Sequence, residues 1–128
     1  MNKLCGNLVA VNELSYKDLL RMFSLLDEYF YNAHYDAFIN DLKEKDWVIV
    51  LRDSASNEIQ GFSTQKLLQV PLNGKILRAL FSGDTIVIRD YWQQTELMHV
   101  WGMLALRLID EYRQEELFWF LISMGYRT

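Results

Sequence analysis

Residues 75–88 read KILRALFSGDTIVI, and this stretch decides the fold. The pattern predicts one long strand with a bulge at residues 82–84, Ser-Gly-Asp, because glycine tolerates the backbone conformations that a bulge requires. A loop at residues 89–94 then leads to an apolar helix at residues 96–112, and residues 117–122, LFWFLI, predict a second strand. A strand, helix and strand in this order make a parallel pair, and ligands that carry phosphate often bind outside the carboxyl ends of such strands.

Both later elements have strong apolar patterns. The helix at residues 96–112 is apolar almost all round, which predicts burial on more than one side. Residues 117–122 are apolar at every position, which is typical of a parallel strand covered on both faces.

The first half of the chain predicts two helices between strands. Ser15 is the expected N-cap of a helix whose apolar residues repeat at helical spacing up to Phe30. Gly61 indicates either a bulge or a close approach of two backbones. The other expected elements are a strand at residues 4–11, a helix at 35–43, strands at 47–51 and 59–70, and turns at 53–57 and 71–74.

Composition limits the class of protein. The 128 residues are 51% hydrophobic, which predicts a single domain, residues 1–128, with its own core. The net charge of −4 comes without a basic stripe, so nucleic acid is not an expected partner. No segment approaches about 20 uninterrupted apolar residues, so a membrane is not expected either. The single cysteine, Cys5, cannot form an internal disulfide, is expected to be buried, and fits a reducing cytoplasm. With two histidines and no cysteine cluster, we expect no metal site.

This order of elements is similar to the GNAT acyltransferase superfamily. The residues that carry the resemblance are FSGDTIV at 81–87, RDYW at 89–92 and WFLISMGYRT at 119–128. The resemblance implies an α+β fold with a mixed, mainly antiparallel sheet and helices on both faces. It also implies an acyl-CoA-dependent N-acyltransferase that acts on an amine. The sequence stops at Thr128, about where the usual C-terminal helix and strand pair would begin, so the chain looks like a divergent or C-terminally truncated member.

The resemblance also implies where acetyl-CoA or another acyl-CoA binds. In the superfamily the thioester lies at the bulge, where two strands part, and the next turn wraps the pyrophosphate with backbone N–H groups at a helix N-terminus. The matching positions here are Gly83, Thr85, Ile86, Val87, Tyr91, Trp92, Gln93, Gln94 and Thr95.

The turn at residues 91–96 departs from the superfamily pattern. It has no glycine, and it carries the bulky Trp92. Glu96 lies in the first helical turn, where it would repel a phosphate, and Thr95 is the expected N-cap. We therefore expect a helix end that is satisfied by its own residues.

Three side chains are candidates for catalysis. Asp84 at the bulge can act as a general base on the amine, or it can fix the bend through a hydrogen bond to the backbone. His99 can relay a proton, or it can be a hydrogen-bonded core histidine. Tyr126 matches the tyrosine that protonates the leaving thiolate in the superfamily, although it lies close to the last residue of the sequence.

Two functions of different classes stay open at this stage. One is an acyl-CoA-dependent N-acyltransferase. The other is a non-catalytic GNAT-like module that binds a ligand or a protein partner, with a homodimer as one form. The absence of glycine at residues 91–96 leaves open whether the chain is an enzyme.

Overall fold

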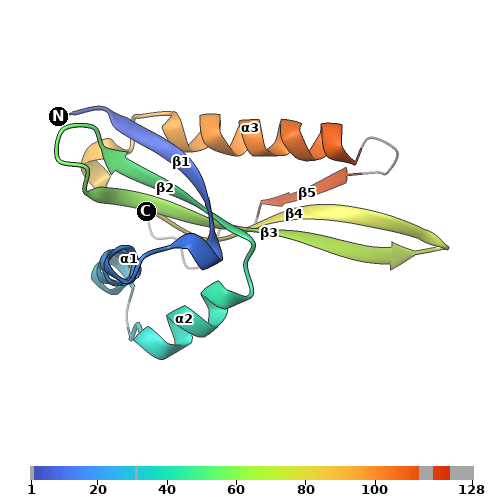
Figure 1. Ribbon diagram of the computed structural model, residues 1–128, viewed down its shortest axis with the longest axis horizontal. Helices are drawn as coiled ribbons and strands as arrows, with labels where there is room; N and C mark the ends of the chain where they lie inside the picture. Colours follow the sequence, from blue (N-terminus) through green and yellow to red (C-terminus); the bar gives the residue numbers. More distant parts are fainter. Residues whose placement is uncertain (1, 31, 113–116, 122–128) are drawn as a thin grey trace.

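The computed structural model describes residues 2–30 and 32–112, together with the backbone of residues 117–121. These residues form five strands and three α-helices (Figure 1). In chain order they are β1 (Leu4–Ala10), η1 (Val11–Glu13), α1 (Tyr16–Tyr29), α2 (Tyr35–Lys43), β2 (Trp47–Asp53), β3 (Ile59–Leu72), β4 (Lys75–Val87), η2 (Arg89–Tyr91), α3 (Glu96–Glu111) and β5 (Leu117–Leu121), where η marks a 3₁₀-helix.

The strands form a single sheet in the order β1-β2-β3-β4-β5. The first four strands are antiparallel neighbours. β5 lies parallel to β4, with Arg78 opposite Leu117 and Ser82 opposite Leu121. The predicted fold class is confirmed: the sheet is mixed and mainly antiparallel.

Helices cover both faces of the sheet. α1 and α2 lie on one face and α3 lies on the other (Figure 1). On β2, Val48 and Val50 pack into the core beneath α1 and α2, whereas Ile49 and Leu51 pack on the side of α3. A strand that is buried on both faces reads as an uninterrupted apolar run, which explains the sequence of β2.

Local signals in the sequence fix most boundaries. The Ser15 hydroxyl accepts from the Asp18 N–H at 3.1 Å, so the predicted N-cap of α1 is confirmed. Asn73 and Gly74 both have positive φ, which is the conformation of a two-residue hairpin turn. The predicted turn was too long, because Pro71 pairs with Ile76 inside the β3–β4 ladder.

The predicted bulge in β4 is present. Ser63 of β3 faces Thr85 and Gln65 faces Ser82, so the two residues Gly83 and Asp84 stand opposite the single residue Thr64.

The bulge changes which face the rest of β4 presents. Leu80 packs beneath α3, whereas Ile86 packs into the core beneath α1 and α2. Residues six apart in a regular strand share a face, because side chains alternate with a period of two. The extra residue at the bulge therefore moves Ile86 to the opposite side of the sheet.

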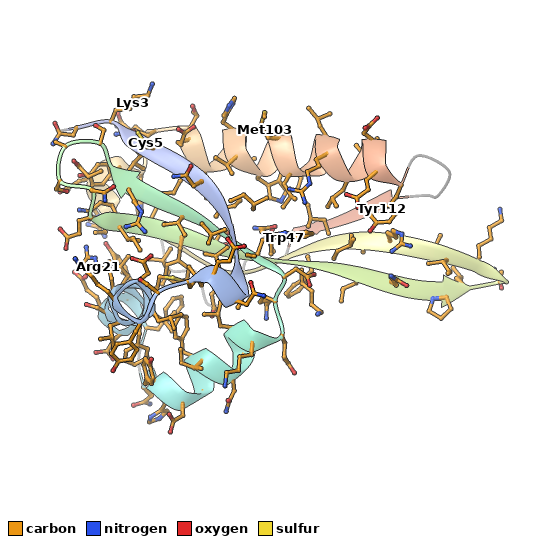
Figure 2. All side chains as sticks on the ribbon, in the orientation of Figure 1. Lys3, Cys5, Arg21, Trp47, Met103 and Tyr112 are labelled. Atoms are coloured by element: carbon orange, nitrogen blue, oxygen red, sulfur yellow. The ribbon has the colours of Figure 1, made fainter. Side chains whose placement is uncertain are left out.

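The prediction that the last helix is buried on more than one side is wrong. Its buried residues, Leu104, Ala105 and Leu108, lie along one face. The opposite face is apolar and exposed, and it includes Met98 (58%), Met103 (59%), Leu106 (67%) and Ile109 (40%). Figure 2 shows Met103 on the outer side of α3. Hydrophobicity marked these residues as suited to burial, but the described chain supplies a partner for only one face.

The prediction of a buried thiol is also wrong. Cys5 is exposed on β1, which is an edge strand (Figure 2). Its neighbour Leu4 takes the buried position, since successive side chains of a strand point to opposite faces. Within the described residues, no helix is long and apolar enough to cross a membrane.

Candidate functional site

The described part of β5 runs beside β4 as far as the start of the bulge. The parallel ladder ends at Ser82, whereas β4 continues along β3 to Val87. Within the described residues, the edge of β4 at residues 83–87 has no β5 residue beside it.

A chain of hydrogen bonds between side chains holds the bulge in shape. Ser82 Oγ donates to Gln65 Oε1 at 2.9 Å, and Gln65 Nε2 donates to Ser63 Oγ at 2.8 Å. The Ser63 and Thr85 hydroxyls are 2.7 Å apart, and Thr85 Oγ1 donates to the Gly83 carbonyl at 3.1 Å. Because Ser63, Gln65 and Ser82 are buried, this network fixes the conformation of the bulge.

A cavity of about 460 Å³ lies on the α1–α2 side of the bulge, and we call it the bulge pocket. Gly83 and Asp84 form its edge on the sheet. The remaining walls come from the end of α1, from α2 and the residues on either side of it, and from β4: Leu26, Asn32, Ala33, His34, Ala37, Phe38, Asp41, Lys45 and Phe81.

Asp84 is a half-buried carboxylate that has no partner in the described part of the chain. Among the described residues it makes no side-chain hydrogen bond and no ion pair within 4 Å. Burial raises the pKa of Asp84 above its ordinary value, the charge of Asp41 raises it further, and Lys45 acts in the opposite direction. The expected alternative role, an Asp84 side chain that fixes the bend, is filled instead by Thr85.

Gly83 is packed too closely for any side chain. A methyl group there would lie 2.6 Å from Thr64 Oγ1 and 3.0 Å from Lys45 Cε. Thr64 Oγ1 itself is buried with no hydrogen-bond partner among the described residues. A buried hydroxyl rarely goes without a partner, so a ligand oxygen at the bulge is a natural acceptor for it.

A second cavity, of about 360 Å³, lies on the α3 side of the sheet, and we call it the α3 pocket. Five of the residues expected to bind acyl-CoA line it: Thr85, Val87, Tyr91, Trp92 and Gln94. Leu4, Leu51, Leu97 and Met98 give it an apolar wall. The α3 pocket and the bulge pocket therefore meet β4 from opposite sides of the sheet.

The segment at residues 91–96 is anchored by the protein itself. The Tyr91 hydroxyl donates to Asp53 Oδ2 at 2.5 Å, and Trp92 Nε1 donates to the Val87 carbonyl at 2.6 Å. Gln94 accepts from the Leu4 N–H at 2.8 Å and thereby protects the edge of β1. In the resembling superfamily this segment wraps a pyrophosphate. Here its side chains are hydrogen-bonded to other parts of the protein.

The expected cap of α3 is not formed. Thr95 is at the N-cap position, but its side chain accepts no hydrogen bond from the helix. Glu96 Oε2 accepts from the Gly6 N–H at 3.3 Å, so this carboxylate is directed to the edge of β1. The prediction of a helix end satisfied by its own side chains is therefore wrong for Thr95. An uncapped helix end suits an anion, and this is the feature of the segment that fits the phosphates of CoA.

The remaining predicted site residues lie apart from the bulge. Ile86 is in the core, so only its backbone can contact a ligand. Gln93, Thr95 and His99 line a third cavity, of about 490 Å³. His99 is exposed on α3, across the sheet from the pocket that holds Asp84. Tyr126 lies outside the described residues.

Sequence reasoning missed three residues at the bulge pocket. Lys45 and Asp41 form an ion pair, with Nζ and Oδ1 3.1 Å apart. Their spacing of four residues at the end of a helix could have predicted this pair from the sequence. Thr64 had no signal, because a threonine inside a strand is ordinary. In the part of the chain that the structure describes, no group of three or more residues of the types that bind metals is close enough to hold an ion.

No protein-family profile and no curated protein sequence matches this chain. Solved structures do match. One is a ribosomal-protein-alanine N-acetyltransferase from Brucella melitensis biovar Abortus 2308, at 14% identity and a TM-score of 0.62, over 95% of this chain and 82% of that one.

Two aminoglycoside acetyltransferases are similar to this chain to the same degree. AAC(6′)-Iy in complex with the bisubstrate analogue CoA-S-monomethyl-acetylneamine matches at 12% identity and a TM-score of 0.61, over 95% of this chain and 80% of that one. AAC(6′)-Ih from Acinetobacter baumannii matches at 9% identity and a TM-score of 0.61, over 94% of this chain and 81% of that one. At these identities the likeness concerns the fold alone. The strand order, the bulge in β4 and these structures together show that the chain has the GNAT fold.

Proposed function

We propose that this chain is an acyl-CoA-dependent N-acyltransferase whose reacting groups meet at the β4 bulge. The observation that carries the proposal is Asp84, a half-buried carboxylate that stands in the bulge pocket and has no hydrogen-bond or ion-pair partner among the described residues. Burying a charge is costly, and a side chain kept in such a position suits a general base.

In the proposed reaction the donor thioester and the amine approach the bulge from opposite sides of the sheet. The acyl-CoA arm lies along the α3 pocket and the amine lies in the bulge pocket. Asp84 takes a proton from the ammonium, and the free amine attacks the thioester carbonyl. A C–N bond forms, the C–S bond breaks, and the thiolate leaves and takes up the second proton that the attacking nitrogen loses. The Thr64 hydroxyl and the backbone N–H groups near Gly83 can stabilise the negative charge on the carbonyl oxygen.

A non-catalytic GNAT-like module is the second candidate. The anchoring of residues 91–96 by the protein's own groups favours it, because these contacts must loosen or be bypassed before the segment wraps a pyrophosphate. In this case the exposed apolar face of α3 is the surface that a partner or a second copy would cover.

A thermal-shift titration with CoA, acetyl-CoA and a longer acyl-CoA tests donor binding. Ligand at 100 times its Kd stabilises the fold by about 2.7 kcal/mol. We expect saturable shifts that disappear in Gly83→Trp, which fills the bulge, and persist in Gly102→Trp, which adds the same side chain where a Cβ meets nothing within 4 Å. A folded wild-type protein that shows no shift with any of the three would contradict donor binding and leave the non-catalytic module.

Asp84→Asn then separates binding from chemistry. If Asp84 is the base, this variant keeps the acyl-CoA shift and loses transfer to amines by about 10²-fold or more. Unchanged transfer in Asp84→Asn would remove Asp84 from the mechanism while leaving the donor site intact.

A further inference from the structure

Lys45 places an ammonium group of the protein itself in the bulge pocket. Its side chain is only 7% exposed, although lysine is usually solvated, and Nζ lies 3.1 Å from Asp41 Oδ1. Nζ also lies 5.9 Å from the centre of the Phe81 ring, within range of a cation–π contact. One wall of this pocket is therefore already built to hold an alkylammonium.

The charges in the pocket are left unbalanced by one. Asp41 and Asp84 are its two carboxylates, and Lys45 is its one ammonium. Lys45 pairs with Asp41, which leaves Asp84 without a cation among the residues that the structure describes. The walls between these groups are apolar and come from Leu26, Ala33, Ala37, Phe38 and Phe81. Such a site suits one further positive charge carried on a hydrocarbon body.

We propose that Lys45 is a specificity-determining residue that limits the bulge pocket to ligands with a single ammonium on a hydrocarbon body. By occupying Asp41, Lys45 removes the second carboxylate that a diammonium or a polycation requires. A second ammonium would also be repelled by Lys45 Nζ. This inference depends on the proposed function only in naming the ligand an acyl acceptor.

Equilibrium binding without CoA tests the inference directly. We would titrate the 128-residue chain with benzylammonium, with butane-1,4-diammonium and with kanamycin, a polycation, by isothermal titration calorimetry at fixed salt. Benzylammonium is expected to bind at least about tenfold more tightly than either polycationic probe. The second ammonium of those probes lacks a charge-assisted hydrogen bond, and one such bond corresponds to about tenfold or more in affinity. Equal or tighter binding of the diammonium to the wild type would overturn the proposal.

Lys45→Met is the decisive variant, because it frees Asp41 while keeping an unbranched side chain. The affinity for butane-1,4-diammonium relative to benzylammonium should rise at least about threefold, as expected for a partly exposed ion pair. Lys43→Met removes the same charge two residues away, from an exposed position outside this pocket, and should leave the ratio unchanged. An unchanged ratio in Lys45→Met, with the fold verified by circular dichroism, would contradict the assignment.

Asp41→Asn gives a second test that keeps Lys45. Without its partner, the Lys45 ammonium is free to neutralise Asp84, so binding of benzylammonium should weaken by about threefold or more. Unweakened binding would again count against the proposal. Amine selectivity without any acyl transfer would overturn the proposed function and not this inference, so the two failures are distinguishable.

Discussion

Asp84 has two properties that selection for stability alone would not retain. It is a carboxylate whose pKa is raised by burial, and no described residue forms a hydrogen bond or an ion pair with it. Because the pKa in the folded state lies above that in the unfolded state, ionising Asp84 costs more in the folded protein. This cost is absent below the ordinary value of 3.8 and is complete above the raised pKa.

Asp84→Asn should therefore raise the Tm at pH 7 even though it is expected to abolish transfer. The gain should disappear as the pH falls below about 3.8, where the wild-type carboxyl becomes neutral in the unfolded state as well as in the folded state. Asp36→Asn on the exposed side of α2 is the control for the change in net charge. A lower Tm for Asp84→Asn than for wild type at pH 7 would mean that the carboxylate is structural.

Asp53 has the opposite character. It is buried, accepts from Tyr91 and from the N–H groups of Ala55 and Ser56, and has a pKa lowered to about 2, chiefly by the Tyr91 hydrogen bond. Its contribution to stability is complete above the ordinary value of 3.8 and is lost as the pH falls through about 2.

Asp53→Asn should lower the Tm at neutral pH, and the difference from wild type should shrink between about pH 4 and pH 2. Thermal unfolding followed across this range measures it. Tyr91→Phe, which removes only the donor, should show a smaller loss over the same range. A difference that is independent of pH would show that the ionised form of Asp53 is not what the folded state prefers.

At the scale of the elements, Gly61 and Gly102 differ in the space available for a side chain. A methyl group at Gly61 would lie 2.8 Å from the Ile86 carbonyl of the neighbouring strand, which is backbone and cannot move aside cheaply. A methyl group at Gly102, in the middle of α3, meets nothing within 4 Å.

Gly61→Ala should cost about 1–3 kcal/mol, the usual effect of overpacking. Gly102→Ala should stabilise the fold by about 0.5–1 kcal/mol, because glycine in a helix interior is unfavourable relative to alanine. Urea unfolding of both variants gives the comparison. A loss of stability in Gly102→Ala would indicate that this position is packed against another chain in solution.

Leu104 and Leu106 make a matched pair on α3, because they differ only in the face on which they lie. Leu104 is 2% exposed and Leu106 is 67% exposed. Leu104→Ala should cost about 2–5 kcal/mol, as for a buried leucine. Leu106→Ala should stay within about 0.5 kcal/mol of wild type. A large, concentration-dependent cost for Leu106→Ala would instead place a partner on the exposed face.

The sequence predicted the elements better than the contacts between them. Ser15, Asn73 and Gly74 act on their own neighbours, so the start of α1 and the β3–β4 turn could be read directly. Which faces of α3 are buried could not be read from the sequence. An apolar residue has a tendency to be buried, but it does not show which element will bury it. The bulge was predictable from Gly83, but the Ser63–Gln65 network and the Lys45–Asp41 wall depend on how β3 and α2 lie beside it.

At the scale of the whole molecule, the bulge places neighbouring residues of β4 on opposite faces of the sheet. Thr85 lines the α3 pocket, while Gly83 and Asp84 line the bulge pocket. The bulge produces this division by reversing the alternation of side chains along β4. A donor and an acceptor bound on opposite faces can then meet without sharing a pocket.

Amide chemical shifts in NMR spectra should separate the two sites. Acetyl-CoA is expected to shift the resonances of Val87 and Leu97, and benzylammonium those of Ala37 and Phe38, because each set lines one pocket. Gly83 should respond to both ligands, since it lines the bulge pocket and its carbonyl accepts from Thr85, which lines the α3 pocket. Gly102→Ala, which lies outside both pockets, should leave each pattern unchanged. Two ligands that shift the same residues would contradict a two-sided site, and the attack of the amine across the bulge would then have no geometric basis.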